Sequence, residues 1–249
     1  EQITDALYRL GCIKREQGDL PKALNMFDKA LEEDELHEPT LVALVDLHSR
    51  QKEWEQVIHF KKQLLLCAST DSQRFKLYDE VGDLWEKELK NPAKAIEAFS
   101  EASALQPRNH VMLHKLLKLY TETSQWERTI EIIDRIAEIE ERPEAKAKYA
   151  NAVGAILRDE MKDAPGALAR FDTALDLDPV GALKSFEAIN RILNQQKDWK
   201  GLERAFRKML RRISGKGDKT LEFNLWHNLG VIYRDRLRGF ESAAEAFGM

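Results

Sequence analysis

Cysteine, glycine, proline and long apolar runs are all scarce in this sequence of 249 residues. The two cysteines, Cys12 and Cys67, lack the close spacing of a metal site, and two cysteines cannot build a disulfide framework. We therefore expect a reducing compartment such as the cytoplasm. No apolar run approaches the roughly 18 residues of a membrane span, and no signal-peptide pattern opens the sequence. These absences predict that the chain has no membrane partner.

A strong excess of one charge is also missing, because the formal net charge is only -4. The charge is nevertheless unevenly spread. Residues 1–140 carry 27 acidic and 19 basic residues, whereas residues 141–249 carry 16 and 20. The net charge therefore changes from -8 in the first part to +4 in the second. This asymmetry bears on the kind of partner that each part could bind.

What the sequence does contain is an internal repeat. Four glycines that each follow an aliphatic residue are spaced by 71, 72 and 76 residues: Gly11, Gly82, Gly154 and Gly230. Three tryptophans lie between them, spaced by 72 and 73 residues: Trp54, Trp126 and Trp199. Both series give a period of about 72 residues, which divides into two smaller units. Because the tryptophans recur with this period, we interpret them as core residues at turns rather than as a ligand site.

Each smaller unit contains two amphipathic helical patterns. In the first, apolar residues recur at i, i+3 and i+6, as in Leu41, Leu44 and Leu47, which marks one stripe on a helix. The second pattern is Ala-x3-Phe-x2-Ala. It begins at Ala23, Ala95 and Ala167 and starts once more at Ala243. A small alanine lets two helices approach closely while the phenylalanine fills the space beside it, so the sequence predicts paired helices.

This pattern resembles the tetratricopeptide repeat, a helix–turn–helix of roughly 34 residues with W-x2-L-G-x2-Y followed by A-x3-F. Trp226-x2-Leu229-Gly230-x2-Tyr233 with Ala243-x3-Phe247 shows each of these elements. The resemblance implies an all-α fold, a right-handed α-solenoid of stacked antiparallel helix pairs forming a single domain over 1–249. We expect six full repeats and a partial seventh in a piece of a longer chain, at residues 4–37, 38–71, 75–109, 110–143, 147–181, 183–216 and 223–249.

The even-numbered repeats depart from the consensus. Val45, Leu117 and Asn190 stand where the odd repeats have glycine, and each even repeat has a tryptophan at its turn. Val57, Thr129 and Leu202 likewise replace the first alanine of the second helix. This alternation is similar to bacterial arrays of the family that mix consensus and degenerate repeats. It puts the close approach of the two helices in doubt for the even repeats.

The expected solenoid points to binding rather than catalysis. Stacked helix pairs touch only their neighbours and bury one continuous core. The resemblance implies that the first helices line a concave groove, which suits an extended peptide or a partner helix. Such an open groove lacks the enclosed cavity that most catalysis uses. We therefore expect a protein–protein interaction scaffold that is not an enzyme and has no cofactor and no metal.

Groove positions lie opposite the apolar stripe of each first helix, and their charge changes along the chain. The acidic end is predicted to contain Asp46, Asp79, Asp83 and Glu86. The basic end would hold an acidic segment of a partner protein or peptide, with asparagine amides bonding its backbone. The residues predicted for this basic end are Lys118, Lys148, Asn151, Arg158, Lys184, Arg191, Asn194, His227 and Arg234.

Two other functions stay open. The chain could be the recognition or regulatory arm of a larger enzyme whose catalytic domain lies outside these residues. It could also be an RNA-binding helical repeat, because residues 197–219 carry nine basic and three acidic residues, although the sequence as a whole is not basic.

His110 and His114 have a metal-compatible spacing but no third ligand. Residues 215–220 lack the full spacing of a phosphate-binding loop, and we interpret them as a connection.

Overall fold

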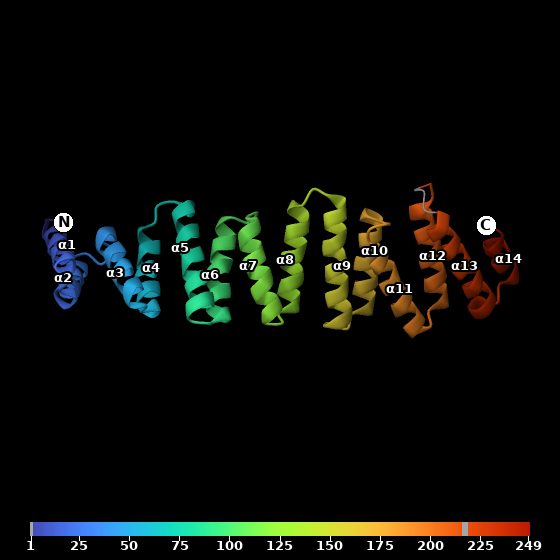
Figure 1. The fold of residues 1–249 in the computed structure, drawn as a ribbon, viewed down its shortest axis with the longest axis horizontal. Helices are drawn as coiled ribbons and strands as arrows, with labels where there is room; N and C mark the ends of the chain where they lie inside the picture. Colours follow the sequence, from blue (N-terminus) through green and yellow to red (C-terminus); the bar gives the residue numbers. More distant parts are fainter. Residues whose placement is uncertain (1, 216–218) are drawn as a thin grey trace. The chain divides into compact units, whose positions relative to one another are not determined.

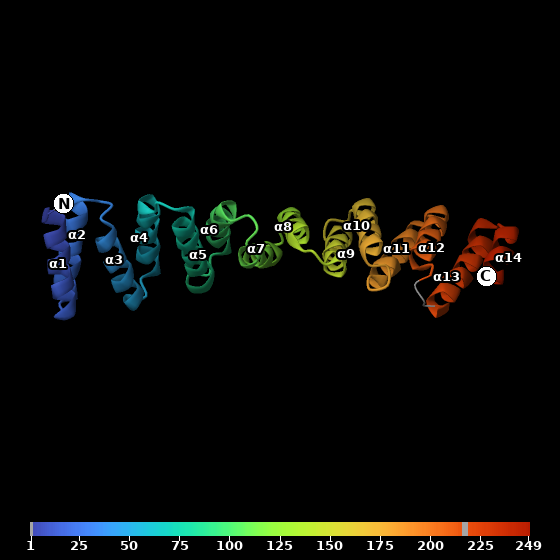
Figure 2. The same cartoon turned by 90° about the horizontal axis from the view of Figure 1, so that it is seen from above.

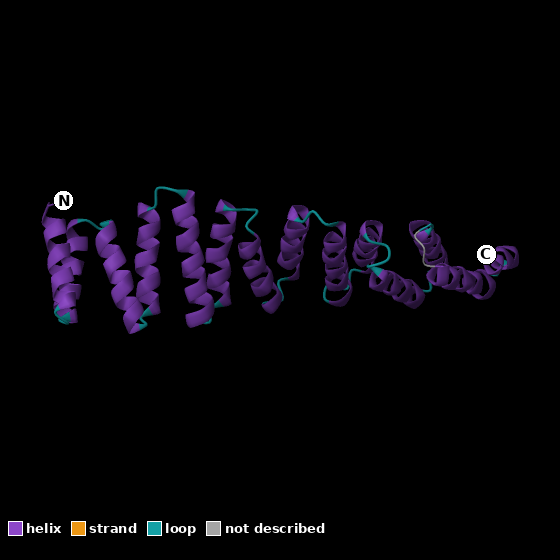
Figure 3. Ribbon diagram, turned by 45° about the horizontal axis from the view of Figure 1, so that its top comes forward, coloured by secondary structure: helices purple, strands orange, loops and turns teal. Residues whose placement is uncertain are grey.

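A computed structural model of the chain describes residues 2–215 and 219–249. These residues form fourteen α-helices and two π-helical turns, and they contain no β-strand (Figure 3). The chain divides into two compact units, unit 1 (Glu1–Thr123) and unit 2 (Ser124–Met249). Within each unit, helices that follow one another in sequence pack side by side (Figures 1 and 2). The predicted all-α fold of stacked antiparallel helix pairs is therefore confirmed.

Unit 1 contains three helix pairs followed by a seventh helix. The pairs are α1 with α2, α3 with α4, and α5 with α6, and α5 continues into the π-helical turn η1. The bounds are α1 Gln2–Glu16, α2 Leu20–Glu33, α3 Glu38–Gln51, α4 Trp54–Cys67, α5 Asp71–Asp83, η1 Leu84–Glu88, α6 Pro92–Leu105 and α7 His110–Glu122. The odd-numbered helices are the predicted first helices of the repeats.

Unit 2 begins with a helix that packs on the first of three further pairs. The pairs are α9 with α10, α11 with α12, and α13 with α14, and α13 continues into η2. The bounds are α8 Trp126–Ile139, α9 Pro143–Asp159, α10 Ala164–Leu177, α11 Leu183–Gln196, α12 Trp199–Ile213, α13 Lys219–Ile232, η2 Tyr233–Leu237 and α14 Phe240–Gly248. Of the predicted connection at 215–220, residues 216–218 lie outside the described residues.

Four of the second helices, α2, α6, α10 and α12, begin after a residue whose side chain caps the helix. Asp19, Asn91, Asp163 and Asp198 each accept a hydrogen bond from the backbone N–H three residues later. Such caps satisfy one of the four N–H groups that a helix start leaves without an internal partner. In α2, α6 and α10, proline also stands within the first two helical positions, where its missing N–H costs nothing.

The glycines and phenylalanines of the repeat meet inside the odd helix pairs. Phe27, Phe99 and Phe171 are fully buried or nearly so. A Cβ built on Gly11, Gly154 or Gly230 would lie 2.5–2.7 Å from the ring of the phenylalanine in the paired helix. At Gly82 the approach to Phe99 is closer still. The conserved spacing between glycine and phenylalanine therefore reflects a contact that leaves no room for a side chain at the glycine.

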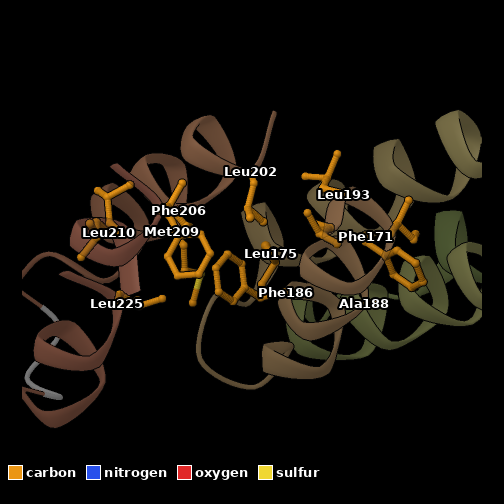
Figure 4. Packing of buried hydrophobic residues seen from close by; sticks show 14 of the residues in the cluster. Phe171, Leu175, Phe186, Ala188, Leu193, Leu202, Phe206, Met209, Leu210 and Leu225 are labelled. Atoms are coloured by element: carbon orange, nitrogen blue, oxygen red, sulfur yellow. The ribbon is translucent and has the colours of Figure 1, made fainter. Parts of the chain in front are cut away.

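The even pairs use apolar side chains in place of that contact. In unit 2, Phe186 of α11 and Phe206 of α12 meet edge to face with ring centroids 4.9 Å apart (Figure 4). They join a core that extends from Phe171 and Leu175 of α10 to Leu225 of α13. Trp199, at the start of α12, is half-buried, and Arg236 of η2 lies over its ring at 4.7 Å. The tryptophan thus packs against the turn of the following helix pair.

One predicted stripe is not buried. Leu10 and Ile13 of α1 are each 47% exposed, whereas the equivalent Leu44 and Leu47 of α3 lie in the core. The difference arises because α3 has a helix on each side, while the corresponding face of α1 has no neighbour among the described residues. Burial of the stripe therefore depends on a preceding helix and not on the pattern alone.

Candidate functional site

Half-buried charges on the first helices of unit 1 form ion pairs with one another. Asp46 of α3 lies 3.5 Å from Arg15 of α1. The Nζ atom of Lys115, on α7, lies 2.5 Å from Asp79 and 2.7 Å from Asp83, both on α5. These pairs join first helices of successive repeats across their exposed faces.

Glu86 completes this arrangement, since it lies 2.7 Å from Lys118 of α7. The structure therefore engages all four residues of the predicted acidic end, and Lys118, predicted for the basic end, is one of their partners. We name the set Arg15, Asp46, Asp79, Asp83, Glu86, Lys115 and Lys118 the paired row of unit 1. Its acids and bases nearly balance, so it offers little net charge to a partner.

The pKa of Asp83 shows how closely the row is coupled. Partial burial acts to raise the pKa of this carboxyl group, but hydrogen bonds from Lys115 and Lys87 outweigh burial and hold the pKa below its usual value. Asp28 of α2 behaves in the opposite way, because burial raises its pKa and the nearby His48 offsets only part of this effect. The ionised form of Asp83 is thus favoured by the fold, and that of Asp28 is disfavoured.

We expect the stability of unit 1 to fall in acid partly through Asp83. Because the pKa is lower in the folded state, the contribution of Asp83 is complete above the unfolded value of about 3.9 and is lost as the pH falls through the folded pKa. Asp83→Asn should therefore reduce the loss of stability between pH 5 and pH 2.5 in urea denaturation. Asp28→Asn serves as the control and should not reduce it. An equal acid response in Asp83→Asn and the unmodified chain would contradict this assignment.

The first helices of unit 2 present cations that are not paired. Lys148 of α9 and Lys184 and Arg191 of α11 are exposed, and none has an ion-pair partner within residues 2–215 and 219–249. We name these three residues the basic row. All three were predicted as part of the basic end, and the structure leaves them open to solvent.

Asn151 lies on the same face of α9 and is held by a buried hydroxyl. Ser185 of α11 is fully buried, and its Oγ donates a hydrogen bond of 2.8 Å to Asn151 Oδ1. The amide nitrogen of Asn151 is left to donate outward. Asn194 differs, because its amide nitrogen already bonds the backbone oxygen of Asn190 at 2.8 Å.

Three other predicted residues of the basic end are engaged locally. Arg158 forms two hydrogen bonds, of 2.7 and 2.6 Å, with the adjacent Asp159 and lies over the ring of Phe171. Arg234 repeats this arrangement with Asp235 and Phe247. The exposed ring of His227 lies between two aromatic rings, with centroids 6.2 Å from Phe223 and 5.5 Å from Phe247. The two arginines therefore help to order the repeat and contribute less free charge than the basic row.

The second helices of unit 2 neutralise part of the basic run at 197–219. Lys208 of α12 lies 2.8 Å from Asp172 of α10, and Arg212 binds both Asp172 and Asp176. In the same way, Arg170 of α10 forms two hydrogen bonds with Asp134 of α8, at 2.8 and 2.7 Å. These pairs reduce the positive charge that a nucleic-acid phosphate chain would need.

Unit 1 also has an apolar cleft among its first helices, of about 320 Å³. Val42, Val45 and Leu77 form part of its lining, and Val42 is 51% exposed. Within the described residues, no group of three or more His, Cys, Asp or Glu side chains could hold a metal ion. No helix of the described part is both long and apolar enough to cross a bilayer. The surfaces available for recognition are thus charged rows and shallow apolar clefts.

Comparison with known families identifies the first helix pair of this chain. Residues 4–35 match the sequence model of the tetratricopeptide repeat, and they coincide with the helix pair α1 and α2. The Gly11–Phe27 contact of that pair recurs at the glycine–phenylalanine pairs of α5 with α6, α9 with α10, and α13 with α14. Residues 4–35 of this chain thus form a tetratricopeptide repeat. Tetratricopeptide repeats generally serve as scaffolds for protein interactions rather than as enzymes.

Solved structures that resemble the chain include tetratricopeptide-repeat proteins. The crystal structure of MamA is 20% identical, covering 72% of this chain and 93% of MamA, with a TM-score of 0.39. YrrB, described as a TPR protein with an unusual peptide-binding site, is 16% identical over 73% of this chain and 90% of its own, with a TM-score of 0.39. A repeat protein from Parabacteroides merdae is 16% identical over 100% and 92%, with a TM-score of 0.40. No curated protein sequence matches the chain.

The sequence analysis did not predict which charges of the helical array would form ion pairs. A usable signal exists, since several pairs join opposite charges 36 residues apart, about one repeat: Asp79 with Lys115, Asp134 with Arg170, Asp172 with Lys208, and Asp176 with Arg212. Residues one repeat apart occupy equivalent positions on successive helices. Opposite charges at this spacing therefore indicate a pair, and a base without such an acid indicates a free charge.

Proposed function

We propose that this chain binds an acidic, extended segment of another protein along the first helices of unit 2. The observation that supports the proposal is the basic row of Lys148, Lys184 and Arg191, exposed cations that form no ion pair with an acid of the described residues. Asp159 interacts electrostatically with Arg191 but forms its ion pair with Arg158. Unit 1 has comparable positions but fills them with internal ion pairs. In unit 2 the ion pairs that join successive repeats lie on the second helices instead, and Lys148, Lys184 and Arg191 of the first helices take part in none of them.

The three cations come from successive first helices, so a bound segment would cross from α9 to α11. Carboxylates of the segment would pair with the two lysines and the arginine, and the arginine can bind a carboxylate through two parallel hydrogen bonds. The outward amide nitrogen of Asn151 can donate to a backbone carbonyl between them. Charge complementarity of this kind accelerates encounter and sets specificity more than it adds affinity.

A binding experiment with a labelled acidic peptide tests this proposal. We expect a fluorescein-labelled peptide of alternating Glu and Ala to bind the chain, and the same peptide with Lys in place of Glu not to bind. The triple variant Lys148→Glu/Lys184→Glu/Arg191→Glu should weaken binding of the acidic peptide at least tenfold in fluorescence anisotropy. The reason is that it replaces three attractive contacts with repulsive ones.

The matched control reverses three exposed bases of α12, Lys200, Arg204 and Arg211, none of which has an ion-pair partner in the described part of the chain. This control changes the net charge by the same amount and should weaken binding less than threefold. Equal losses in the two triple variants would show that only net charge matters and would overturn the proposal. Failure of the acidic peptide to bind at low salt would do the same.

A further inference from the structure

A second cleft lies on unit 1, between the second helices α4 and α6 and above the first helix α5. Its volume of about 550 Å³ falls within the range of about 300–1,000 Å³ that is usual for binding sites. Tyr78, Val81 and Trp85 of α5 and η1 form its floor at helical spacing. Leu65 of α4 and Ala98 of α6 face it from the two walls. The cleft is thus apolar at its base and separate from the first-helix positions discussed above.

Unit 2 has a corresponding cleft that is bridged. Its volume is about 360 Å³, and it lies between α10 and α12 above α11. The ion pairs of Asp172 with Lys208 and Arg212 cross from one wall to the other. In unit 1 no ion pair joins α4 to α6 among the described residues. Ion pairs therefore join the two second helices across the cleft of unit 2, whereas none among the described residues joins them across the cleft of unit 1.

The open cleft is bordered by an apolar side chain in solvent. Leu66 is 72% exposed, follows Leu65 in α4 and lies one turn from Lys62 on the same face of the helix. At the η1 side, Lys94 of α6 lies 4.1 Å above the ring of the half-buried Trp85. A large exposed leucine beside an apolar cleft is a usual feature of interaction sites.

The walls of the cleft carry opposite charges that are free to interact. Lys62, on the α4 wall, is exposed, as are Glu97 and Glu101 on the α6 wall. None of these three has an ion-pair partner within residues 2–215 and 219–249. An occupant that is complementary to the cleft therefore has an apolar face, basic side chains along one edge and an acidic side chain along the other.

We propose that this cleft binds an amphipathic helix of a partner protein, with basic residues facing Glu97 and Glu101 and an acidic residue facing Lys62. A helix satisfies its own backbone hydrogen bonds, whereas an extended segment needs partners for its backbone, and the lining of this cleft contains no asparagine or glutamine amide to supply them. The α6 wall from Lys94 to Glu101 spans about 10.5 Å, or two helical turns, which matches apolar anchors at i, i+4 and i+7.

A stapled 16-residue helix with Leu at positions 4, 8 and 11, Lys along one edge and Glu along the other is a suitable probe. We expect it to bind the full chain and to lose at least tenfold in affinity when its leucines are replaced by glutamine. Leu66→Glu should weaken binding at least tenfold, because it places a charge beside the apolar face. Glu97→Lys/Glu101→Lys should weaken binding and favour a probe with Glu along both edges. All three residues are exposed, and circular dichroism verifies that the variants fold.

The variant lacking the basic row, Lys148→Glu/Lys184→Glu/Arg191→Glu, should bind the probe unchanged, which separates this cleft from the proposed acidic-segment site. Absence of probe binding, or binding that neither Leu66→Glu nor the double glutamate reversal affects, would overturn the proposal. Sedimentation velocity provides a further test. A dimer that dissociates on Leu66→Glu would show that a second copy of the chain occupies the cleft instead.

Discussion

Phe99→Ala is expected to lower the free energy of unfolding of unit 1 by about 3–5 kcal/mol. The ring of Phe99 is fully buried and fills the space that Gly82 leaves between α5 and α6. Removing it leaves a cavity lined by a glycine, which cannot move a side chain into the gap. Urea denaturation of the full chain, with hydrogen exchange followed separately in α5 and α6, gives the loss of stability and its location.

Combination with Gly82→Ala makes this test specific. Alone, Gly82→Ala should cost about 1–3 kcal/mol, because its Cβ would overlap the ring of Phe99. In the Phe99→Ala background the overlap is gone, so the same change should cost much less. Costs that simply add would show that the two residues do not share one contact. Val111→Ala, at an exposed position of α7, is the control and should leave stability nearly unchanged.

Arg212→Ala should produce the second large loss, of about 2 kcal/mol in unit 2. The side chain of Arg212 is only 12% exposed, and it donates hydrogen bonds to both Asp172 and Asp176 across the interface of α12 with α10. Burial acts to lower the pKa of Arg212, but the hydrogen bonds to these aspartates outweigh burial and raise it. Loss of the guanidinium leaves Asp172 with Lys208 as its remaining ion-pair partner among the described residues.

Hydrogen exchange in α10 and α12 measures this effect where it arises. Arg212→Lys should lie between the unmodified chain and Arg212→Ala, because lysine keeps the charge but cannot bind both aspartates through a planar fork. Arg204→Ala, on the same helix, removes an arginine that is exposed and should change exchange little. If Arg204→Ala and Arg212→Ala have equal effects, the ion pairs across the interface do not stabilise unit 2.

The sequence predicts the helix pairs well because their determinants are local and periodic. Capping residues such as Asp19 and Asp163 mark helix starts, and the glycine–phenylalanine spacing marks the contact inside each odd pair. Burial of a stripe needs a neighbouring helix, so the same pattern is exposed in α1 and buried in α3. The π-helical turns η1 and η2 were not predicted, because each depends on one additional residue per turn rather than on polarity.

The candidate site is less predictable from sequence than the fold. Charge and position alone grouped Arg158 with Arg191, but the neighbouring Asp159 binds Arg158 and leaves Arg191 exposed. Likewise, the sequence predicted Asp79 and Asp83 to form a free acidic surface. In the structure, Lys115 of the next first helix forms ion pairs with both. A long charged side chain can reach several ion-pair partners, and the packing of the helices determines which pair forms.

The hairpin turns use left-handed backbone in residues that do not favour it. In unit 1, Lys52 and Lys90 have positive φ angles of 60° and 51°, whereas Gly18 takes this conformation in the first turn. In unit 2, Lys162, Lys197 and Arg238 likewise have positive φ angles. Each of these cations follows the carboxyl end of a helix, where the backbone carries partial negative charge. Electrostatic attraction thus offsets part of the steric cost at these five turns, whereas Ser124 has the same conformation at its turn without a charge.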